Sequence, residues 1–385
     1  MENSGKRTLG KDIQAFINLK IPFLKIQFFK FIYRLFCTYK VLIIVIINSI
    51  FKKIISYEFP KIFYAGAKKG NLGGPLAKTQ KLNKFFPEYN FKFNIVYVLS
   101  NFPFLSHKSI SLLKRQKIAI VLNQNGVFYP AWFKEDWKKE NLKIAKVYHS
   151  ADYVFWQSNF CKIASDKFLG KRLGEGEVLY NAVDTQKFIP KSKKLRNIFK
   201  LLITGNINKQ NNYRIYTLLK ALQKIIKINK FVHLYIAGYL EDIKYFKHET
   251  ERLGIKDFVF FLGPYSQENA PEIYQNADAY ITVSYQDNCP SAVIEAMSCG
   301  LPVLYSSSGG VPELVGENAG IGLNVPHDWE KIHIPEINII VMGVFEIIEK
   351  RQKFSESARE RALNLFDIND WIKRHDDLFK MYLDK

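Results

Sequence analysis

The segment that decides the fold is SYQDNCPSAVIEAMSCGLPVLYSSSGGVPELVGE, residues 284–317. Its pattern predicts a strand that ends at Tyr285, a short polar loop from Gln286 to Pro290, and a helix that begins near Ser291. The first turn of such a helix has unpaired backbone N–H groups and a partial positive charge. At the carboxyl end of a parallel strand, this terminus is suited to bind a pyrophosphate.

Two carboxylates, Asp287 and Glu295, flank the start of this predicted helix. With Asp287 in the loop, its side chain can face a cleft while Glu295 points up from the helix. Carboxylates so placed can accept hydrogen bonds from vicinal sugar hydroxyls. The alternative is an ordinary strand–loop–helix unit with a solvated Glu295.

Strands and helices alternate on both sides of this segment, which predicts βαβ units with mostly parallel sheets. The chain has 385 residues, enough for two domains. The polar, basic stretch DTQKFIPKSKKLRN is the expected linker. Expected strands before it are KIFYAG, FNIVYVLS, QKIAIVLNQ and EVLYNAV, and after it NIFKLLITGNI, FVHLYIAGY, DFVFFLGPY, DAYITVSY and LPVLYSS.

We therefore predict an α/β fold of two Rossmann-like domains with parallel sheets that face a central cleft. The first domain is expected over residues 56–187 and the second over 188–365. A C-terminal helix over 366–385 is expected, and it would cross back to the first domain.

Residues 1–55 form a basic, apolar N-terminal segment that differs from the rest. Its longest uncharged run, Val41 to Phe51, has 11 residues, fewer than the roughly 18 needed to span a bilayer. No signal-peptide cleavage pattern follows it. Two alternatives stay open: a helix lying in the interface of an anionic membrane, or a helix packed on the first domain.

The formal net charge is +20, from 56 Lys and Arg against 36 Asp and Glu. This excess favours anionic partners, although a biased base composition would produce it as well. Basic residues are scattered and no nucleic-acid module is evident, so no nucleic-acid partner is expected. The four cysteines form no CxxC pair or zinc spacing, which predicts reduced thiols, a cytoplasmic protein and no metal site.

Segment 284–317 closely resembles the donor site of the retaining glycosyltransferases of family 4, which have the GT-B fold. The shared pattern comprises Asp287, Glu295-Ala296-Met297, Gly300, Pro302-Val303 and Gly309-Gly310-x-Pro312-Glu313. In that family the first acid is usually Glu. The resemblance extends from about residue 61 through GNLGGPLAKTQKL, ADYVFWQSNFCK, LYNAVDTQKFIP and FLGPYSQENAPEIYQNADAYI.

The resemblance implies roles for individual residues. Glu295 would bind the ribose, and Asp287 the transferred sugar. The other donor-binding residues it implies are Gly73, Gly74, Gly205, Asn206, Asn211, Pro264, Tyr265, Asn288, Cys289, Pro290, Ser291 and Ala292.

Two departures from the family bear on activity. Where the family has an Arg and a Lys that neutralise the leaving diphosphate, the chain has Asn206 and Asn211. Lys209 is our candidate substitute and, with Asp287, our candidate catalytic residue. Where the family often has a His, the chain has Gln124 and Asn125, which can hydrogen-bond a sugar but cannot act as a base.

His149 is nearby in sequence. We expect Gln124, Asn125 and His149 to lie on the acceptor side of the cleft.

The resemblance implies transfer of a sugar, with retention, from a nucleoside-diphosphate-sugar donor to a glycan or lipid-linked acceptor. It implies no metal or other cofactor, and a role in polysaccharide or glycolipid biosynthesis. The cytoplasmic protein would lie peripherally at the inner face of the membrane. The alternative is a non-catalytic GT-B scaffold that partners an active transferase.

Overall fold

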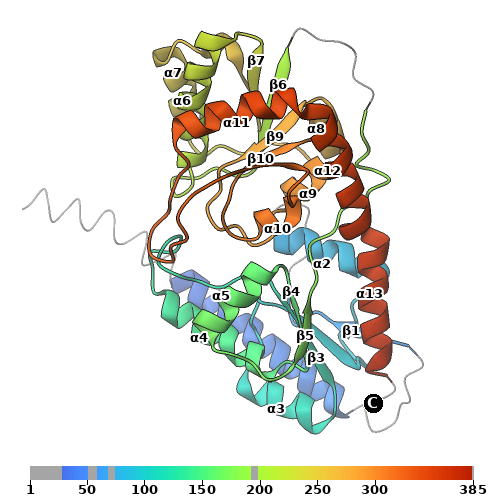
Figure 1. Ribbon diagram of the computed structural model, residues 1–385. Helices are drawn as coiled ribbons and strands as arrows, with labels where there is room; N and C mark the ends of the chain where they lie inside the picture. The colour runs from blue at the N-terminus through green and yellow to red at the C-terminus, as the bar shows by residue number, and fades with distance from the viewer. Residues whose placement is uncertain (1–27, 51–58, 68–73, 192–197, 384–385) are drawn as a thin grey trace, which may run out of the picture.

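The computed structural model describes residues 28–50, 59–67, 74–191 and 198–383. These residues form two α/β domains, stacked one above the other in Figure 1. Each domain contains a parallel sheet flanked by helices, as expected from the alternation of strands and helices. Gly73 of the predicted Gly-rich loop lies outside the described residues, and so do residues 1–27 and 51–55 of the N-terminal segment.

The N-terminal domain has a five-stranded parallel sheet with the order β1-β2-β3-β4-β5. Every residue of β2, β3 and β4 is buried, because helices cover both faces of the sheet. The strands are β1 (Ile62–Phe63), β2 (Ile95–Leu99), β3 (Ala119–Gln124), β4 (Tyr153–Trp156) and β5 (Glu175–Val178). The helices are α2 (Gly74–Phe85), α3 (His107–Arg115), α4 (Trp137–Ser150) and α5 (Asn159–Leu169).

The C-terminal domain has a six-stranded parallel sheet with the order β11-β10-β9-β6-β7-β8. The strands are β6 (Phe199–Thr204), β7 (Val232–Ala237), β8 (Val259–Gly263), β9 (Ala279–Thr282), β10 (Val303–Ser306) and β11 (Gly320–Leu323). The helices are α6 (Tyr213–Ile228), α7 (Ile243–Arg252), α8 (Ala270–Gln275), α9 (Ser291–Ser298), α10 (Val311–Val315), α11 (Ile337–Glu349) and α12 (Arg351–Leu365), with a short 3₁₀ helix, η2 (Lys256–Phe258). The strand order reverses between β6 and β9, and ligands of such sheets bind at this switch point.

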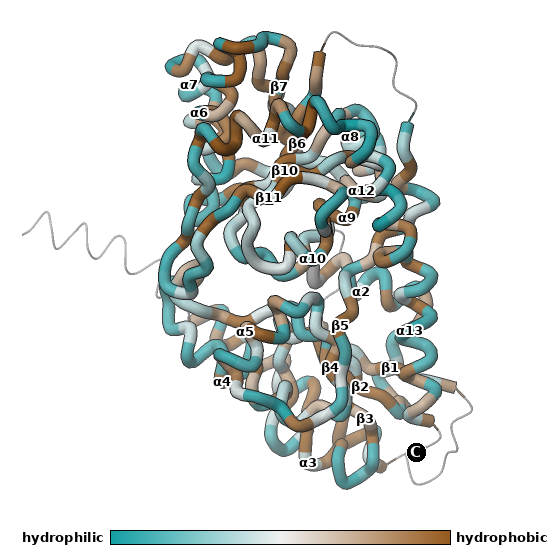
Figure 2. The backbone as a smooth tube through the Cα atoms, in the orientation of Figure 1, coloured by the Kyte–Doolittle hydropathy of each residue, from teal (hydrophilic) through white to brown (hydrophobic). Residues whose placement is uncertain are grey.

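The hydrophobic pattern of the sequence accounts for these layers. On α6, the predicted apolar stripe of Ile215, Leu218, Leu219 and Leu222 is buried against the sheet. Figure 2 shows strands such as β6 and β10 in the brown of hydrophobic residues at the centre of their domain. The apolar residues thus fix which face of each helix packs inward.

Helix α13 (Ile368–Met381) leaves the C-terminal domain and packs on the N-terminal domain (Figure 1). Its Trp371 and Phe379 lie in one hydrophobic cluster with Tyr97 of β2. His375 is fully buried, and its ring nitrogens lie 2.9 Å from Tyr97 Oη and 2.8 Å from the Trp371 carbonyl oxygen. Burial lowers the His375 pKa to about 3, so the ring is neutral and joins the helix to the sheet without a charge.

An N-terminal helix, Phe28–Ile50, packs along the same domain with one face only. Val41 and Val45 are buried in the domain core, and the Asn48 side chain pairs with both backbone groups of Phe93. One face of this helix is therefore packed on the first domain, as one of the two alternatives from the sequence expected. The helix has 23 residues, and an 18-residue window within it has a mean hydropathy of 1.7. By length and composition it could cross a membrane, although the uncharged run alone predicted a segment too short to span.

Three stretches differ from the sequence-based expectation. The predicted strand EVLYNAV contributes only its start to β5, because the chain then leaves the sheet edge and Val183 bridges to Asp367. The predicted strand KIFYAG shortens to two residues, β1. No element was predicted for residues 318–353, where β11, α11 and the start of α12 lie.

Candidate functional site

A cleft of about 830 Å³ separates the two sheets at the carboxyl ends of their strands. Its C-terminal wall consists of the turns that follow β6, β7, β8 and β9, which meet at the switch point. Its N-terminal wall includes Lys81, Asn101, Asn125 and Gln157. The volume falls within the range of ordinary small-molecule sites, roughly 300–1,000 Å³.

The loop before α9 is held in an unusual shape. Gln286 has a φ of +52°, a left-handed conformation that costs energy for a residue with a side chain. The loop packs so closely on Gly310 that a Cβ there would overlap the carbonyl oxygen of Asn288. Gly309 has a φ of +69° and faces the loop in the same way. The Gly-Gly pair of the sequence motif is therefore needed to let two backbones meet.

Helix α9 begins at Ser291 as predicted, with Pro290 at its N-cap position. No side chain caps this helix, and Ser291 and Ala292 line the cleft. The backbone N–H groups of the first turn therefore lie at the cleft, where an anion would satisfy them.

Glu295 lies one turn further along α9 and is buried. Its Oε2 accepts a hydrogen bond of 2.9 Å from Tyr274 Oη, and Tyr274 Oη lies 3.1 Å from Thr204 Oγ1. Burial raises the Glu295 pKa, and the charge of Lys81 across the cleft opposes this rise. The carboxylate is thus held in a fixed position at the base of the cleft.

Asp287 is half-buried in the loop and lines the same cleft. Burial raises its pKa, while Arg214 and the backbone N–H groups of Cys289 and Asn288 act in the opposite direction. Both acids predicted from the sequence therefore face one cavity, on either side of the start of α9.

Asn181, near the end of the first domain, binds the loop before α9 (residues 286–290) through its side chain and its backbone. Its Nδ2 donates 2.6 Å to the Cys289 carbonyl oxygen, and its backbone N–H donates to Cys289 Sγ at 3.2 Å. Burial raises the pKa of the Cys289 thiol to about 12, so it is a thiol and not a thiolate. Cys289 thus serves to position the loop.

A second interdomain contact comes from Glu313 of the sequence motif. Its carboxylate accepts backbone N–H bonds from Asn159 at 2.8 Å and Phe160 at 2.7 Å, in the first turn of α5. The acid therefore sits at the positive end of a helix in the opposite domain. This contact holds the two walls of the cleft at a fixed separation.

The N-terminal wall is a network of amides around a buried lysine. Lys78 Nζ donates to Asn123 Oδ1 at 2.8 Å and to Asn125 Oδ1 at 2.9 Å. Asn125 Oδ1 also accepts from Gln157 Nε2. Burial lowers the Lys78 pKa to about 7. Of the predicted acceptor-side residues, Asn125 lines the cleft.

The other two acceptor-side residues do not line the cleft. Gln124 is fully buried, and its Nε2 donates to the Gly126 carbonyl oxygen at 2.7 Å. His149 lies on α4, and its Nε2 is 2.7 Å from the Leu169 carbonyl oxygen. The structure therefore places His149 in a contact between α4 and the end of α5, because α4 ends just before the amino end of β4 and the cleft lies at the carboxyl ends of the strands.

Several predicted donor-binding residues line the cleft, namely Gly205, Asn206, Pro264, Tyr265, Asp287, Cys289, Pro290, Ser291, Ala292 and Glu295. Asn288 packs beside them against Gly126, and Gly74 is the first residue of α2. Asn211 stabilises the loop after β6 through its own backbone contacts, with Nδ2 donating to the Asn206 carbonyl oxygen at 3.1 Å.

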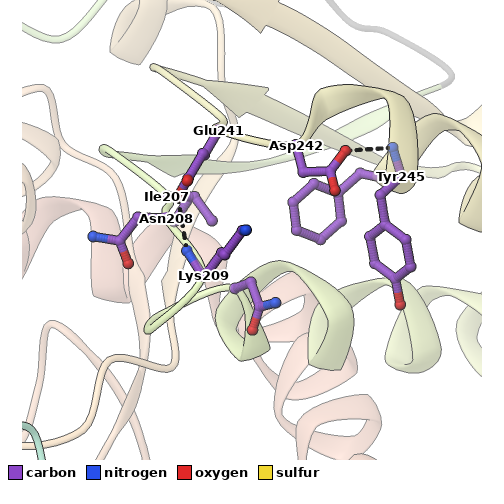
Figure 3. Close-up of a pocket in the computed structure, with 8 residues that line it drawn as sticks. Ile207, Asn208, Lys209, Glu241, Asp242 and Tyr245 are labelled. Carbon is purple, nitrogen blue, oxygen red and sulfur yellow. Dashed lines mark hydrogen bonds between the residues drawn. The ribbon is translucent and has the colours of Figure 1, made fainter. Parts of the chain in front are cut away.

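Lys209 lines a different pocket, of about 320 Å³, with Glu241 and Tyr245. Figure 3 shows this pocket, in which the Lys209 backbone N–H donates to Glu241 and that of Tyr245 donates to Asp242. Lys209 is absent from the residues that line the cleft. Ile207 and Asn208 line both cavities, so the loop leaves the cleft at Lys209, a turn that proximity along the chain does not reveal.

Two cations that line the cleft were not identified from the sequence, Lys81 and Arg214. Lys81 lies three residues after Lys78 on α2, and this spacing places both on one helix face. Arg214 lies in the first turn of α6, directly after the β6 loop. Arg214 could have been noticed from its position at the start of a helix directly after the β6 loop, whereas Lys81 lies in the second half of α2 and has no such local signal.

Comparison with known proteins shows which proteins this chain is similar to. Residues 184–361 match the family Glycosyl transferases group 1. Among curated relatives, the chain is 32% identical over 134 residues to the D-inositol 3-phosphate glycosyltransferase of Mycobacteroides abscessus, an alignment that covers 34% of this chain and 27% of that protein. It is 26% identical over 224 residues to the UDP-Gal:alpha-D-GlcNAc-diphosphoundecaprenol alpha-1,3-galactosyltransferase of Escherichia coli, with 54% of each covered.

Solved structures show the fold over most of the chain. Anabaena Alr3699/HepE in complex with UDP superposes with a TM-score of 0.62 at 18% identity, covering 80% of this chain and 82% of that one. Sucrose-phosphate synthase from Thermosynechococcus elongatus gives a TM-score of 0.62 at 16% identity, covering 81% and 82%. The predicted GT-B fold is confirmed. At these identities the likeness concerns the fold, and the matched region spans only 27% and 54% of the two curated relatives.

Proposed function

We propose that this protein is a glycosyltransferase that moves a sugar from a nucleoside-diphosphate-sugar donor to an acceptor hydroxyl. One observation supports this proposal above all others: the uncapped start of α9 and two carboxylates, Asp287 and Glu295, face one cleft at the switch point of the C-terminal sheet. The helix terminus suits a diphosphate, and the acids suit sugar hydroxyls. The match to Glycosyl transferases group 1 covers these residues.

The chemistry within this proposal is transfer with retention, as the resemblance to family 4 implies. The donor loses its nucleoside diphosphate from the anomeric carbon, and the acceptor hydroxyl attacks on the same face. Positioning and electrostatic stabilisation of the leaving diphosphate supply the rate enhancement. NMR of the product linkage tests retention, and activity that EDTA leaves unchanged would support the expectation that no metal is required.

A thermal-shift panel of UDP, ADP, GDP and their sugars tests donor binding, because a ligand of the native state raises the melting temperature by mass action. Turnover is then measured as nucleoside diphosphate release with the donor that binds. Binding with release supports the transferase. No shift with any nucleotide overturns the proposal.

A non-catalytic scaffold is the second candidate, favoured by Asn206 and Asn211 at the positions where family 4 has its Arg and Lys. It predicts a thermal shift with a nucleotide sugar but no release of diphosphate, with or without acceptor. The same panel therefore separates the two candidates.

The N-terminal helix bears on which acceptor the protein uses. Residues 1–55 contain ten Lys or Arg against two acids, and the helix Phe28–Ile50 has no acid at all. Its unpacked face carries exposed apolar residues next to exposed Lys30 and Lys40. The exposed apolar residues of this helix are Phe28, Phe29, Phe31, Ile32, Tyr33, Leu35, Phe36, Tyr39, Ile43, Ile46 and Ile50.

We propose that the exposed face lies in the interface of an anionic membrane, which would bring a lipid-linked acceptor to the cleft. The contacts of Asn48 with Phe93 keep the helix on its domain and favour lying flat over spanning. Aromatic residues and lysines on one helix face suit this location. The position would be peripheral, at the cytoplasmic surface.

Flotation with vesicles of phosphatidylcholine, and with vesicles containing 30 mol% phosphatidylglycerol (roughly the anionic content needed), tests this location. We expect binding to the anionic vesicles only, weakened by salt and lost in the Phe28→Ser, Phe29→Ser, Phe36→Ser variant. The matched control is Phe91→Ser, an exposed phenylalanine elsewhere. Equal flotation of the triple variant and the control would overturn the location.

A further inference from the structure

Arg214 lies at the mouth of the C-terminal wall, in the first turn of α6. Its Nη1 and Nη2 are 3.7 and 3.8 Å from where a Cβ on Gly205 would stand. The guanidinium therefore lies beside the glycine that follows β6. Tyr213 holds this turn in place, because its Oη accepts a 3.1 Å hydrogen bond from the backbone N–H of Tyr285, just before the loop that leads to α9.

Among the described residues, the Arg214 guanidinium has fewer direct partners than the two lysines of α2, although its charge acts on that of Asp287 in the same cleft. Arg214 Nε is buried without a hydrogen-bond partner, and the described residues give the side chain no salt bridge. Lys81 Nζ, in contrast, donates 2.9 Å to the Ala182 carbonyl oxygen, and Lys78 Nζ has two amide partners. A partly buried cation whose Nε–H has no partner can bind an anion that arrives from outside.

The position and the chemistry define that anion. The uncapped first turn of α9 and the Arg214 side chain line the same cleft, at the switch point between β9 and β6. A diphosphate has oxygens on two phosphorus atoms and can meet both at once. Arg binds such oxygens with two parallel N–H donors, which a lysine cannot do.

We propose that Arg214 binds the diphosphate of the donor and stabilises it as it leaves, taking the place that the sequence had suggested for Lys209. This inference rests on the proposed transferase function. In the step itself, the bond between the anomeric carbon and the diphosphate oxygen breaks, and its electron pair stays on that oxygen. The acceptor oxygen bonds to the anomeric carbon, and its proton passes to the departing diphosphate. Arg214 transfers no proton and supplies positive charge where negative charge grows.

Isothermal titration with UDP, ADP and GDP, each paired with its nucleoside, tests the assignment in the full chain. We expect Arg214→Ala to weaken binding of the preferred diphosphate by about 10- to 100-fold, as for loss of a charge-assisted hydrogen bond. The matched nucleoside should bind within about twofold of wild type, because it has no phosphate. Arg214→Lys should recover part of the loss, and Lys209→Ala should change neither ligand.

The outcomes separate the inference from the function on which it depends. If Arg214→Ala and Lys209→Ala bind the diphosphate equally well, or if Arg214→Ala weakens the nucleoside as much as the diphosphate, the inference is wrong while the function stands. If wild type binds no nucleoside diphosphate, the proposed function fails and the inference with it. Arg214→Lys guards against misfolding, since it keeps the charge and the stem of the side chain.

Discussion

The two walls of the cleft are built in different ways. The C-terminal wall presents backbone N–H groups at the start of α9 and two acids held by local structure, Asp287 and Glu295. The N-terminal wall presents side-chain amides, with Asn125 and Gln157 arranged around buried Lys78. A strand–loop–helix unit fixes its groups within some thirty residues of sequence, whereas an amide network needs segments far apart in the chain. The comparison predicts that nucleotide affinity depends on the first wall and acceptor use on the second.

The largest effect is expected on the C-terminal wall. Glu295→Gln keeps the size of the side chain but removes a buried carboxylate, and we expect the affinity for the preferred nucleoside diphosphate to fall about 10- to 100-fold. Titration calorimetry measures this change. Glu272→Gln, an exposed acid on α8, is the control. Equal affinity of Glu295→Gln and wild type would break the proposed division between the walls.

The next effect concerns how the free energy of unfolding depends on pH through Lys78 in the N-terminal wall. Burial lowers the Lys78 pKa from its ordinary 10.5 to about 7 in the native state. Between these values the unfolded chain holds the proton and the native chain does not, so stability rises with pH across this window. Below about pH 7 both states hold the proton and this dependence vanishes.

Lys78→Met removes the titrating group, and wild type should gain up to about 1.4 kcal/mol per pH unit relative to it between pH 7 and 10. Urea unfolding of both proteins at pH 7.5, 8.5 and 9.5 measures the difference. Parallel stability curves for the two proteins would show that Lys78 is charged in the native state, and the account of this wall would need revision.

A smaller effect, on stability, is expected where Glu313 of the C-terminal domain contacts the start of α5 in the other domain. Glu313→Gln keeps one acceptor for the α5 backbone but loses the charge at the helix N-terminus, so we expect about 1 kcal/mol lower stability. Thermal unfolding should show a lower melting temperature for Glu313→Gln than for Glu317→Gln, which changes an exposed acid four residues later, beyond the end of α10. If the two variants melt together, Glu313 does not hold the walls.

The smallest effect on nucleotide binding is expected for Asn125→Ala. This variant removes an amide from the N-terminal wall, and the diphosphate affinity should stay within about twofold of wild type. Transfer to acceptor should fall about tenfold relative to donor hydrolysis, because the acceptor loses a hydrogen-bonding partner. A parallel loss of nucleotide affinity would show that the two walls are not separate in function.

Different parts of the cleft could be predicted from the sequence to different extents. The positions of Asp287, Glu295 and the start of α9 follow from a local pattern, because each neighbour is close in sequence and the turn residues set the loop. Lys209 and His149 were expected at the cleft, but Lys209 lines another pocket and His149 contacts the Leu169 carbonyl oxygen. The course of a loop and the position of a helix end cannot be inferred from proximity along the chain.

The sequence by itself determined the two α/β domains, the strand–loop–helix at residues 284–317 and the acids on it, since hydrophobic periodicity and turn chemistry act over short distances. Tertiary structure alone decided which cations reach the cleft. Arg214 and Lys81 come from helices in different domains. It also decided that Glu313 binds the start of α5, 153 residues away along the chain. These contacts depend on how the packed domains orient their helix ends, and no short-range pattern encodes that orientation.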